Sequence, residues 1–216
     1  MPKLRVFLLS TALLLFPGGL GLLAQEGVVS VPETNGPPVL VDGTFSPGEW
    51  DDALSIPAWD GVTLYLKQEK GHVYVGIHCP DLMAPITDLF IEPAEGEIHQ
   101  LHVSAQLGEI VLPAEGEEAP PWVWGHSPQW YANEVRWDAG ERRRLIETGM
   151  DEGRAQVVSM FPYDGFEFQI RREKFGAGEW RIRLEVPSAA EYDTPPAFPV
   201  GTSRHNSGGW LVLNLG

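Results

Sequence analysis

Cysteine is almost absent from this sequence: Cys79 is the only one among 216 residues. One cysteine cannot form a disulfide within the chain, so we expect packing to hold the fold, with or without the help of a metal ion. Cys79 continues the alternation of Val73, Val75 and Ile77. This position predicts a buried, small hydrophobic side chain rather than a reactive thiol or a thiolate ligand.

Basic residues are also scarce. The chain has 15 Lys and Arg against 30 Asp and Glu, and its formal net charge is −15. Binding to phosphate backbones or to anionic lipid requires a basic surface, so this balance argues against both partners. The one basic run, Arg142–Arg144, lies between Glu141 and Glu147 and is predicted to be a solvated strand or turn.

The familiar catalytic signatures are missing from the sequence. It contains no nucleophile elbow, no zinc signature and no phosphate-binding loop, and the Gly-His-Ser at Gly125 lacks the second glycine that should follow Ser127. Acidic residues are abundant, but no carboxylate pair is singled out by its spacing. We therefore expect a protein that is not an enzyme.

The first 24 residues have the pattern of a secretory signal peptide. Lys3 and Arg5 precede an apolar run from Val6 to Phe16, and the segment ends in the small residue Ala24. Glycines and a proline interrupt the apolar stretch, which disfavours an uncleaved membrane anchor. We expect a secreted or periplasmic protein, with no stable membrane insertion after cleavage near Ala24.

Proline and glycine are plentiful in the rest of the chain, and long helical patterns are missing. Residues 25–37 are polar and proline-rich and are predicted to be a spacer, so that residues 38–216 form a single domain. Short alternating segments follow one another, beginning with a hairpin of 62–68 and 72–79 that is expected to have one dry and one solvated face. Many short strands in one domain predict an all-β fold, an antiparallel β-sandwich or jelly roll.

Several motifs, in this order, resemble family 9 carbohydrate-binding modules, which belong with the DOMON-like β-sandwiches. The entry motif is VDGTFSPGEWDDA, and the hairpin VTLYLKQEKGHVYVGIHCPD, the acidic strand TDLFIEP, the segment HQLHVSAQLGEI and the late strand EWRIRLEVP follow it. The resemblance covers 38–105 well and 178–216 loosely, whereas 108–165 has no counterpart. It implies that Asp42-Gly43 forms a turn, that Trp50 folds back to plug one end of the sandwich, and that Ala53 is small so that this turn lies close to a sheet.

The tryptophan clamp with which such modules hold sugar is not present here. Leu82–Pro85 precede the acidic strand, and GTSRHNSG precedes the last strand, so neither position offers an aromatic ring. A different platform is available in PPWVWGHSPQWYANEVRW, which contains Trp122, Trp124, Trp130 and Tyr131 in loop-like surroundings. Arg204 and Asn206 could supply polar contacts near the last strand. The alternative is that these aromatics form a satellite core beneath an insertion.

Metal or heme binding is open as well. Asp81, Asp88 and Glu92 cluster around one strand start and offer the oxygen ligands that calcium prefers, and a structural calcium ion is often present in the family that the motifs resemble. His99 and His102 should point to opposite faces of a strand and make a poor metal pair. Met83 near His78 leaves open a heme site of the DOMON-like kind.

Together these features predict a secreted, non-catalytic carbohydrate-binding domain, expected to be a monomer, that could act beside carbohydrate-degrading enzymes. A ring that stacks on a sugar and a few hydrogen bonds would provide the binding energy. The alternatives are a heme- or metal-binding DOMON-like domain, and a structural or protein-interaction β-sandwich that has lost sugar binding.

Overall fold

The computed structural model describes residues 27–59, 61–80, 86–133, 135, 139–159, 164–187 and 196–216. The predicted signal peptide lies outside these residues, as do Asp81, Met83 and Trp137, the last tryptophan of the aromatic stretch. Within the described ranges, no helix is long and apolar enough to span a membrane.

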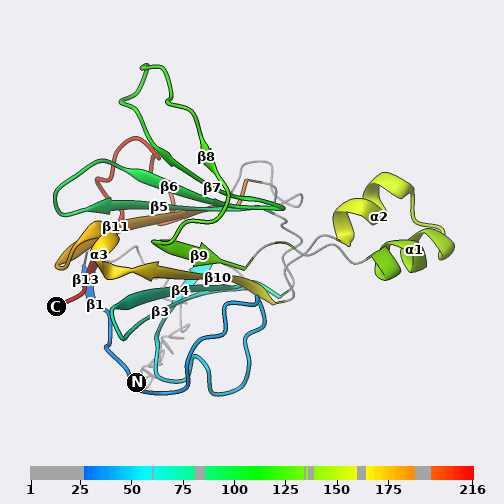
Figure 1. Cartoon of the computed structure of the whole chain (residues 1–216), viewed down its shortest axis with the longest axis horizontal. Helices are drawn as coiled ribbons and strands as arrows, with labels where there is room; N and C mark the ends of the chain where they lie inside the picture. The colour runs from blue at the N-terminus through cyan, green and yellow to red at the C-terminus, as the bar shows by residue number, and fades with distance from the viewer. Residues whose placement is uncertain are drawn as a thin grey trace, which may run out of the picture.

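Two β-sheets form the body of the protein (Figure 1). The larger sheet has eight strands: β1 (Val28–Ser30), β5 (Thr87–Pro93), β6 (His99–Val103), β7 (Leu107–Val111), β8 (Val123–Trp124), β11 (Glu179–Glu185), β12 (Ala197–Phe198) and β13 (Leu211–Asn214). Its order is β1-β13-β11-β5-β6-β7-β8, with β12 paired to β11. The smaller sheet has the order β2-β3-β4-β10-β9, formed by Leu54–Trp59, Val62–Glu69, His72–His78, Gly165–Arg171 and Trp130–Ala132. All pairings except β1 with β13 are antiparallel, so the predicted all-β sandwich is confirmed.

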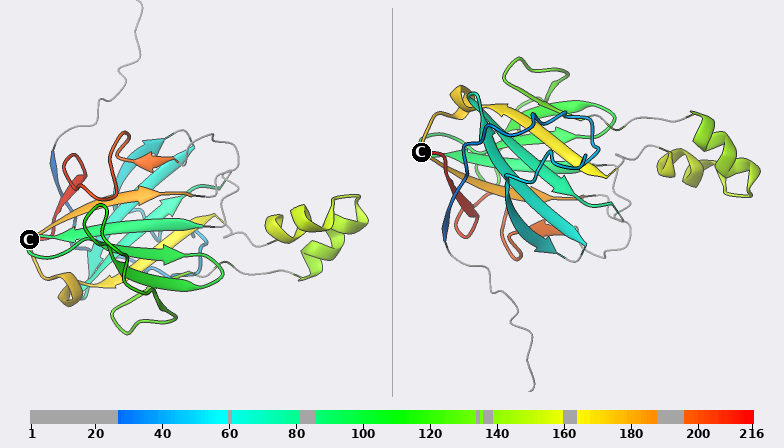
Figure 2. Two further views of the ribbon diagram at one scale, coloured as in Figure 1. Left: turned by 90° about the horizontal axis from the view of Figure 1, so that it is seen from above. Right: turned by 90° about the horizontal axis from the view of Figure 1, so that it is seen from below.

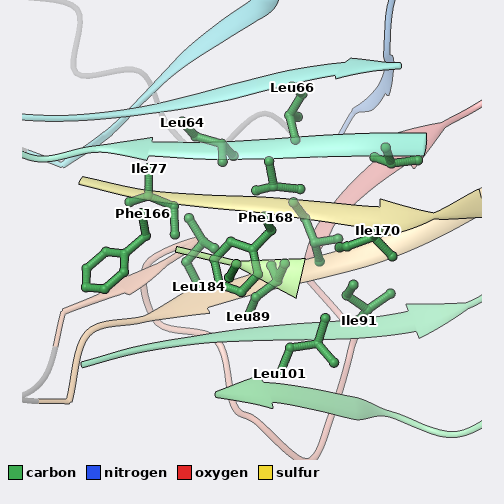
Figure 3. Packing of buried hydrophobic residues seen from close by; sticks show 14 of the residues in the cluster. Leu64, Leu66, Ile77, Leu89, Ile91, Leu101, Phe166, Phe168, Ile170 and Leu184 are labelled. Atoms are coloured by element: carbon green, nitrogen blue, oxygen red, sulfur yellow. The ribbon is translucent and has the colours of Figure 1, made fainter. Parts of the chain in front are cut away.

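The core lies between the two sheets and follows from the alternation of apolar residues along each strand. Leu64, Ile77 and Phe168 of the five-stranded sheet face Leu89 and Leu101 of the eight-stranded sheet (Figure 3). All five side chains are completely buried. Cys79 belongs to the same cluster, and burial raises the pKa of its thiol to about 12, which confirms the prediction of an inert residue.

The outer face of the five-stranded sheet is covered, so the prediction of a solvated face on the first hairpin is wrong. The chain from Pro37 to Ala53 crosses this face, and Trp50 packs there against Phe45, with ring centroids 5.6 Å apart, and against Tyr65 at 5.8 Å. Gly76 lies directly beneath, where a Cβ would come within 2.9 Å of the Trp50 ring. Trp50 is buried as expected, but it lies on a sheet face rather than plugging an end of the sandwich.

Hydrogen bonds to two buried ionisable residues fasten this covering segment. The Glu167 carboxylate accepts from the Gly43 amide at 2.8 Å and from the Trp50 indole at 3.0 Å. The Lys67 ammonium donates to the Glu49 carbonyl at 2.7 Å and to the Asp52 carboxylate at 3.0 Å. These bonds take the place of a β-ladder, because residues 35–53 form no strand, and Gly43 makes the expected turn with φ of +85°.

Part of the predicted spacer belongs to the domain, which corrects the boundary at residue 38. Residues 28–30 form β1, which pairs in parallel with β13. Val31 is buried in the main core, and the Thr34 amide donates to the Gln68 carbonyl at 2.8 Å. Parallel pairing with a distant strand leaves no local signal in the sequence, and the short run VVSV could not show it.

In the part of the chain that the structure describes, three short helices interrupt the strands: α1 (Ala139–Glu147), α2 (Glu152–Val158) and α3 (Arg172–Phe175). The first two pack on each other and project away from the sandwich (Figures 1 and 2). The basic run lies in α1, so it is helical rather than a strand or turn. Its side chains Arg142 and Arg144 pair with Glu152 and Glu141, because i to i+3 neighbours meet on a helix and α2 lies alongside.

Candidate ligand-binding site

The outer face of the eight-stranded sheet carries a row of polar and aromatic side chains. Across four strand pairings, Glu185 lies opposite Asp88, Asp88 opposite His102, His102 opposite Gly108, and Gly108 opposite Trp124. Residues directly opposite each other in a sheet point to the same face. The register therefore brings together residues from five strands that are far apart in the sequence.

One end of this row is an indole pair. Trp122 and Trp124 stack with ring centroids 5.1 Å apart and an interplanar angle of 20°. They rest on Gly108, where a Cβ would come within 2.7 Å of two ring carbons of Trp124. Trp124 is 52% exposed and Trp122 is half-buried. A large aromatic surface is thus held in one orientation while one of its rings stays accessible.

His102 links the indole pair to the sheet. Its ring meets Trp122 and Trp124 edge-on, at centroid distances of 5.6 and 5.7 Å. Its Nδ1 lies 2.7 Å from a carboxylate oxygen of Asp88, which is buried. A neutral imidazole that donates from Nδ1 to the carboxylate has its Nε2 as a hydrogen-bond acceptor. Asp88 therefore fixes the imidazole, and the imidazole supports the indoles.

The other end of the row is built around Phe90. Arg183 and Arg204 lie over this ring, with guanidinium carbons 5.1 and 5.7 Å from its centroid, and Trp210 meets it edge-on at 6.2 Å. Both arginines pair with the buried carboxylate of Glu185. Arg183 is buried, whereas the Arg204 side chain is 43% exposed. The chain segment before β13 thus supplies a partly accessible cation.

Gln100 lies between the two ends. It is the register partner of Phe90 on one side and of Ile110 on the other, and it is only 6% exposed. Its side-chain amide makes no hydrogen bond to the rest of the described chain. An amide offers both donors and an acceptor, which is the polar chemistry that matches a hydroxyl group.

Trp130 and Tyr131 are not part of this face, which corrects their assignment to one platform with Trp122 and Trp124. Trp130 is 3% exposed and belongs to the core; its indole nitrogen donates to Glu109 at 2.9 Å, which joins the two sheets at one edge. Tyr131 is 36% exposed but lies opposite Gln169 on the five-stranded sheet and stacks on His126. Trp130 and Tyr131 are neighbours on β9, so they point to opposite faces of the five-stranded sheet. The sequence alone does not show that β8 and β9 belong to different sheets.

The two polar residues predicted near the last strand have different surroundings. Arg204 joins the row through Glu185 and Phe90, as described above. Asn206 is exposed, and its side-chain oxygen accepts from the Gly208 amide at 2.9 Å, which is a local turn contact. Asn206 is therefore assigned to the shape of the loop.

Of the predicted calcium ligands, Asp88 and Glu92 each interact with another side chain. Asp88 and Glu92 lie on the same face of β5, four positions apart, with Phe90 between them. Asp88 is bound to His102, and Glu92 pairs with Arg181 at 3.2 Å. Asp81 lies outside the described residues, and those residues hold no group of three His, Cys, Asp or Glu side chains arranged for a metal ion.

The histidines behave largely as the strand pattern predicts. His99 packs on Phe175 at 4.8 Å and bonds to Glu109, while His102 lies on the outer face, so the two point in opposite directions as expected. His78 packs on Phe45 at 4.7 Å. Met83, with which His78 left a heme site open, lies outside the described residues.

His102, Gln100, Arg183 and Glu185 were not predicted as site residues. Each lies at an alternate position of its strand, on the polar side of that strand, and each is next to a buried apolar residue. That signal marks a half-buried strand and does not distinguish a ligand-facing surface from a solvated one. The decisive information is the pairing of β5 with β11, which comes from tertiary structure.

No protein-family model and no curated protein matches the sequence. Among solved structures, one similar chain is a candidate carbohydrate-binding protein from Bacteroides uniformis ATCC 8492. The two chains are 12% identical over 88% of this chain and 99% of the other, with a TM-score of 0.43. A likeness at this level carries no functional conclusion, and the resemblance to family 9 modules stays a prediction.

Proposed function

We propose that this protein binds carbohydrate, without catalysing a reaction, on the outer face of its eight-stranded sheet. The observation that carries the proposal is the stacked pair of Trp122 and Trp124, with the accessible ring of Trp124 beside His102, whose strand also carries the polar side chain of Gln100. The C–H face of a sugar packs on an aromatic ring, and its hydroxyl groups need donors and acceptors at the ring's edge.

The exposure of Trp124 supports this reading. The neighbouring Val123 is 72% exposed, so β8 presents two large apolar residues to solvent at the edge of the sheet. Leaving them exposed gains nothing for folding, whereas a ligand that covers the ring would recover the burial. The rigid seat on Gly108 also lowers the entropic cost of holding the ring in place for a ligand.

The position differs from the clamp of family 9 modules. Those modules hold sugar between two tryptophans at positions that this chain lacks, whereas here both rings come from residues 122–124, at and just before β8. We propose that the protein is exported, in keeping with residues 1–24, and that it acts beside enzymes that degrade carbohydrates. Mass analysis of the exported protein should give a chain beginning near Gln25, and full-length chain in the membrane fraction would refute the proposal of a cleaved signal peptide.

Glycan-array screening of the exported protein, followed by calorimetric titration of each hit, tests the binding proposal. Trp124→Ala should remove binding and leave the melting temperature nearly unchanged. Tyr131→Ala is the matched control, because it truncates a partly exposed aromatic on the other sheet. The proposal fails if no glycan binds, or if Tyr131→Ala removes binding and Trp124→Ala does not.

A further inference from the structure

The arginines on the outer face each contact a carboxylate. Arg183 contacts Glu185 at 2.6 Å, Arg204 contacts the same carboxylate, and Arg181 contacts Glu92 at 3.2 Å. Asp88 is bound to the His102 imidazole. Three guanidinium groups thus stand against three carboxylates, in a chain whose formal net charge is −15. The face offers hydrogen-bonding groups but no excess of positive charge.

The two ends of the row stand over different strands. The indole pair contacts His102 on β6, whereas Arg204 lies over Phe90 on β5 and pairs with Glu185 on β11. Adjacent strands are about 5 Å apart, and β7, β6 and β5 lie between β11 and β8, which carries Trp124, so the backbones of Trp124 and Glu185 are about 20 Å apart. A ligand that touches both Trp124 and Arg204 must be longer than one sugar ring.

We propose that the ligand is an uncharged oligosaccharide of at least two sugar units that lies across the strands, from Trp124 to Arg204. This inference rests on the proposed function and adds the charge and the length of the ligand. Trp124 stacks on one sugar, Gln100 and His102 meet hydroxyl groups in the middle, and Arg204 binds the next unit.

Arg204 suits this role because it has donors to spare. A guanidinium carries five N–H groups, and the contact with Glu185 uses one of its nitrogens, Nη2. Hydroxyl oxygens can accept from the other donors without displacing Glu185. A carboxylate or sulfate on the ligand would have to compete with Glu185 and would approach the Asp88 carboxylate on the neighbouring strand.

Calorimetric titration with two sets of sugars tests the inference. The neutral set contains gluco-, xylo- and manno-oligosaccharides from single sugars to hexasaccharides, and the anionic set contains oligogalacturonides of the same lengths. Affinity for one neutral series should rise at least about tenfold from the single sugar to the trisaccharide, since a hydrogen bond to a charged group contributes about 1.5–3 kcal/mol. Oligogalacturonides should bind more weakly at every length.

Two arginine variants locate the second contact. Arg204→Ala should abolish the gain with length and leave the affinity for the single sugar within about twofold. Arg204→Gln, which keeps an amide donor, should retain part of the gain and serves as the second variant if Arg204→Ala does not fold. Arg181→Ala is the matched control, because Arg181 is a partly exposed arginine on the same face that also pairs with a glutamate.

The outcomes separate the inference from the proposed function. Equal affinity for single and longer sugars, a preference for oligogalacturonides, or equal effects of Arg204→Ala and Arg181→Ala would overturn the inference while carbohydrate binding stands. Failure of wild-type protein to bind either set would refute both.

Discussion

Trp124 rests on Gly108 so closely that a Cβ on this glycine would come within 2.7 Å of the indole carbons Cε3 and Cζ3. The same Cβ would lie 3.2 Å from Trp122, so one backbone position supports both rings. The backbone of Gly108 has no positive φ, and its conformation is one that alanine can adopt. The glycine is therefore needed for the space it leaves rather than for its flexibility.

Gly108→Ala should displace the indole pair and weaken sugar binding several-fold, with little loss of stability because the rings lie on the surface. Titration with the best glycan hit and the tryptophan emission spectrum would measure the two effects. Gly153→Ala is the control, since its Cβ would meet no atom closer than 3.5 Å. Unchanged affinity in Gly108→Ala would show that the seating of the pair is unimportant.

Trp130→Ala and Trp124→Ala should have opposite consequences. Trp130 is 3% exposed, so its truncation should cost about 3–5 kcal/mol of unfolding free energy through lost burial and a cavity. Trp124 is 52% exposed and should cost less than about 1 kcal/mol. Chemical denaturation of both variants measures the difference, and similar losses in the two would contradict the assignment of one ring to the core and the other to the surface.

Glu167 should make the protein less stable as the pH rises toward neutrality. Burial raises the pKa of Glu167 to about 7, even though the amides of Gly43 and Asp42 and the indole of Trp50 favour the carboxylate; the charge of Glu49 adds to the rise. Between the ordinary pKa of 4.5 and about 7, the folded state holds a proton that the unfolded state has lost. The free energy of unfolding should therefore fall through this window, by at most about 3 kcal/mol.

Urea denaturation at a series of pH values would show this slope in the wild type and its loss in Glu167→Gln. The three N–H groups that donate to the carboxylate favour its ionised form and so act to lower its pKa. A free energy that is flat between pH 5 and pH 8 in both proteins would mean that these donors outweigh burial.

Glu109 should make the protein less stable as the pH falls into the acid range, which is the opposite pH dependence to that of Glu167. Burial by itself would raise its pKa, but hydrogen bonds from His99, Lys174 and Trp130 and the charge of Lys174 outweigh burial and lower the pKa to about 2. Between about 4.5 and about 2 only the unfolded state binds the proton, so stability is present above pH 4.5 and is lost as the pH falls.

The expected loss is up to about 3 kcal/mol, seen as a falling midpoint in acid urea titrations. Glu109→Gln should be less stable than wild type at pH 6 and should lack this acid slope. Glu117→Gln is the control, because Glu117 lies in an exposed loop. Parallel acid profiles for wild type and Glu109→Gln would contradict the assignment.

The strands and their buried sides could be predicted from sequence because alternation is a local property. Val73, Val75 and Ile77 show it, and all three point into the core. The pairing of β5 with β11 could not be predicted, and neither could the place of Trp50 on a sheet face, because both depend on partners distant in the chain. For the same reason the sequence could not separate Trp130 from Trp122 and Trp124, because its place in the core depends on the sheet to which β9 belongs.

The parallel pairing of β1 with β13 has a consequence for how the protein folds as it is synthesised. Val28 lies opposite Val212, and the turn at Gly43 depends on a carboxylate 124 positions later in the chain. The first contact cannot form until nearly the whole domain has left the ribosome, and the second cannot form before residue 167 has left it. Folds dominated by such distant contacts form slowly, and strands that are still unpaired promote aggregation before folding is complete. The early segment must therefore spend most of synthesis unprotected, and a chaperone that shields residues 27–53 should raise the yield of folded protein.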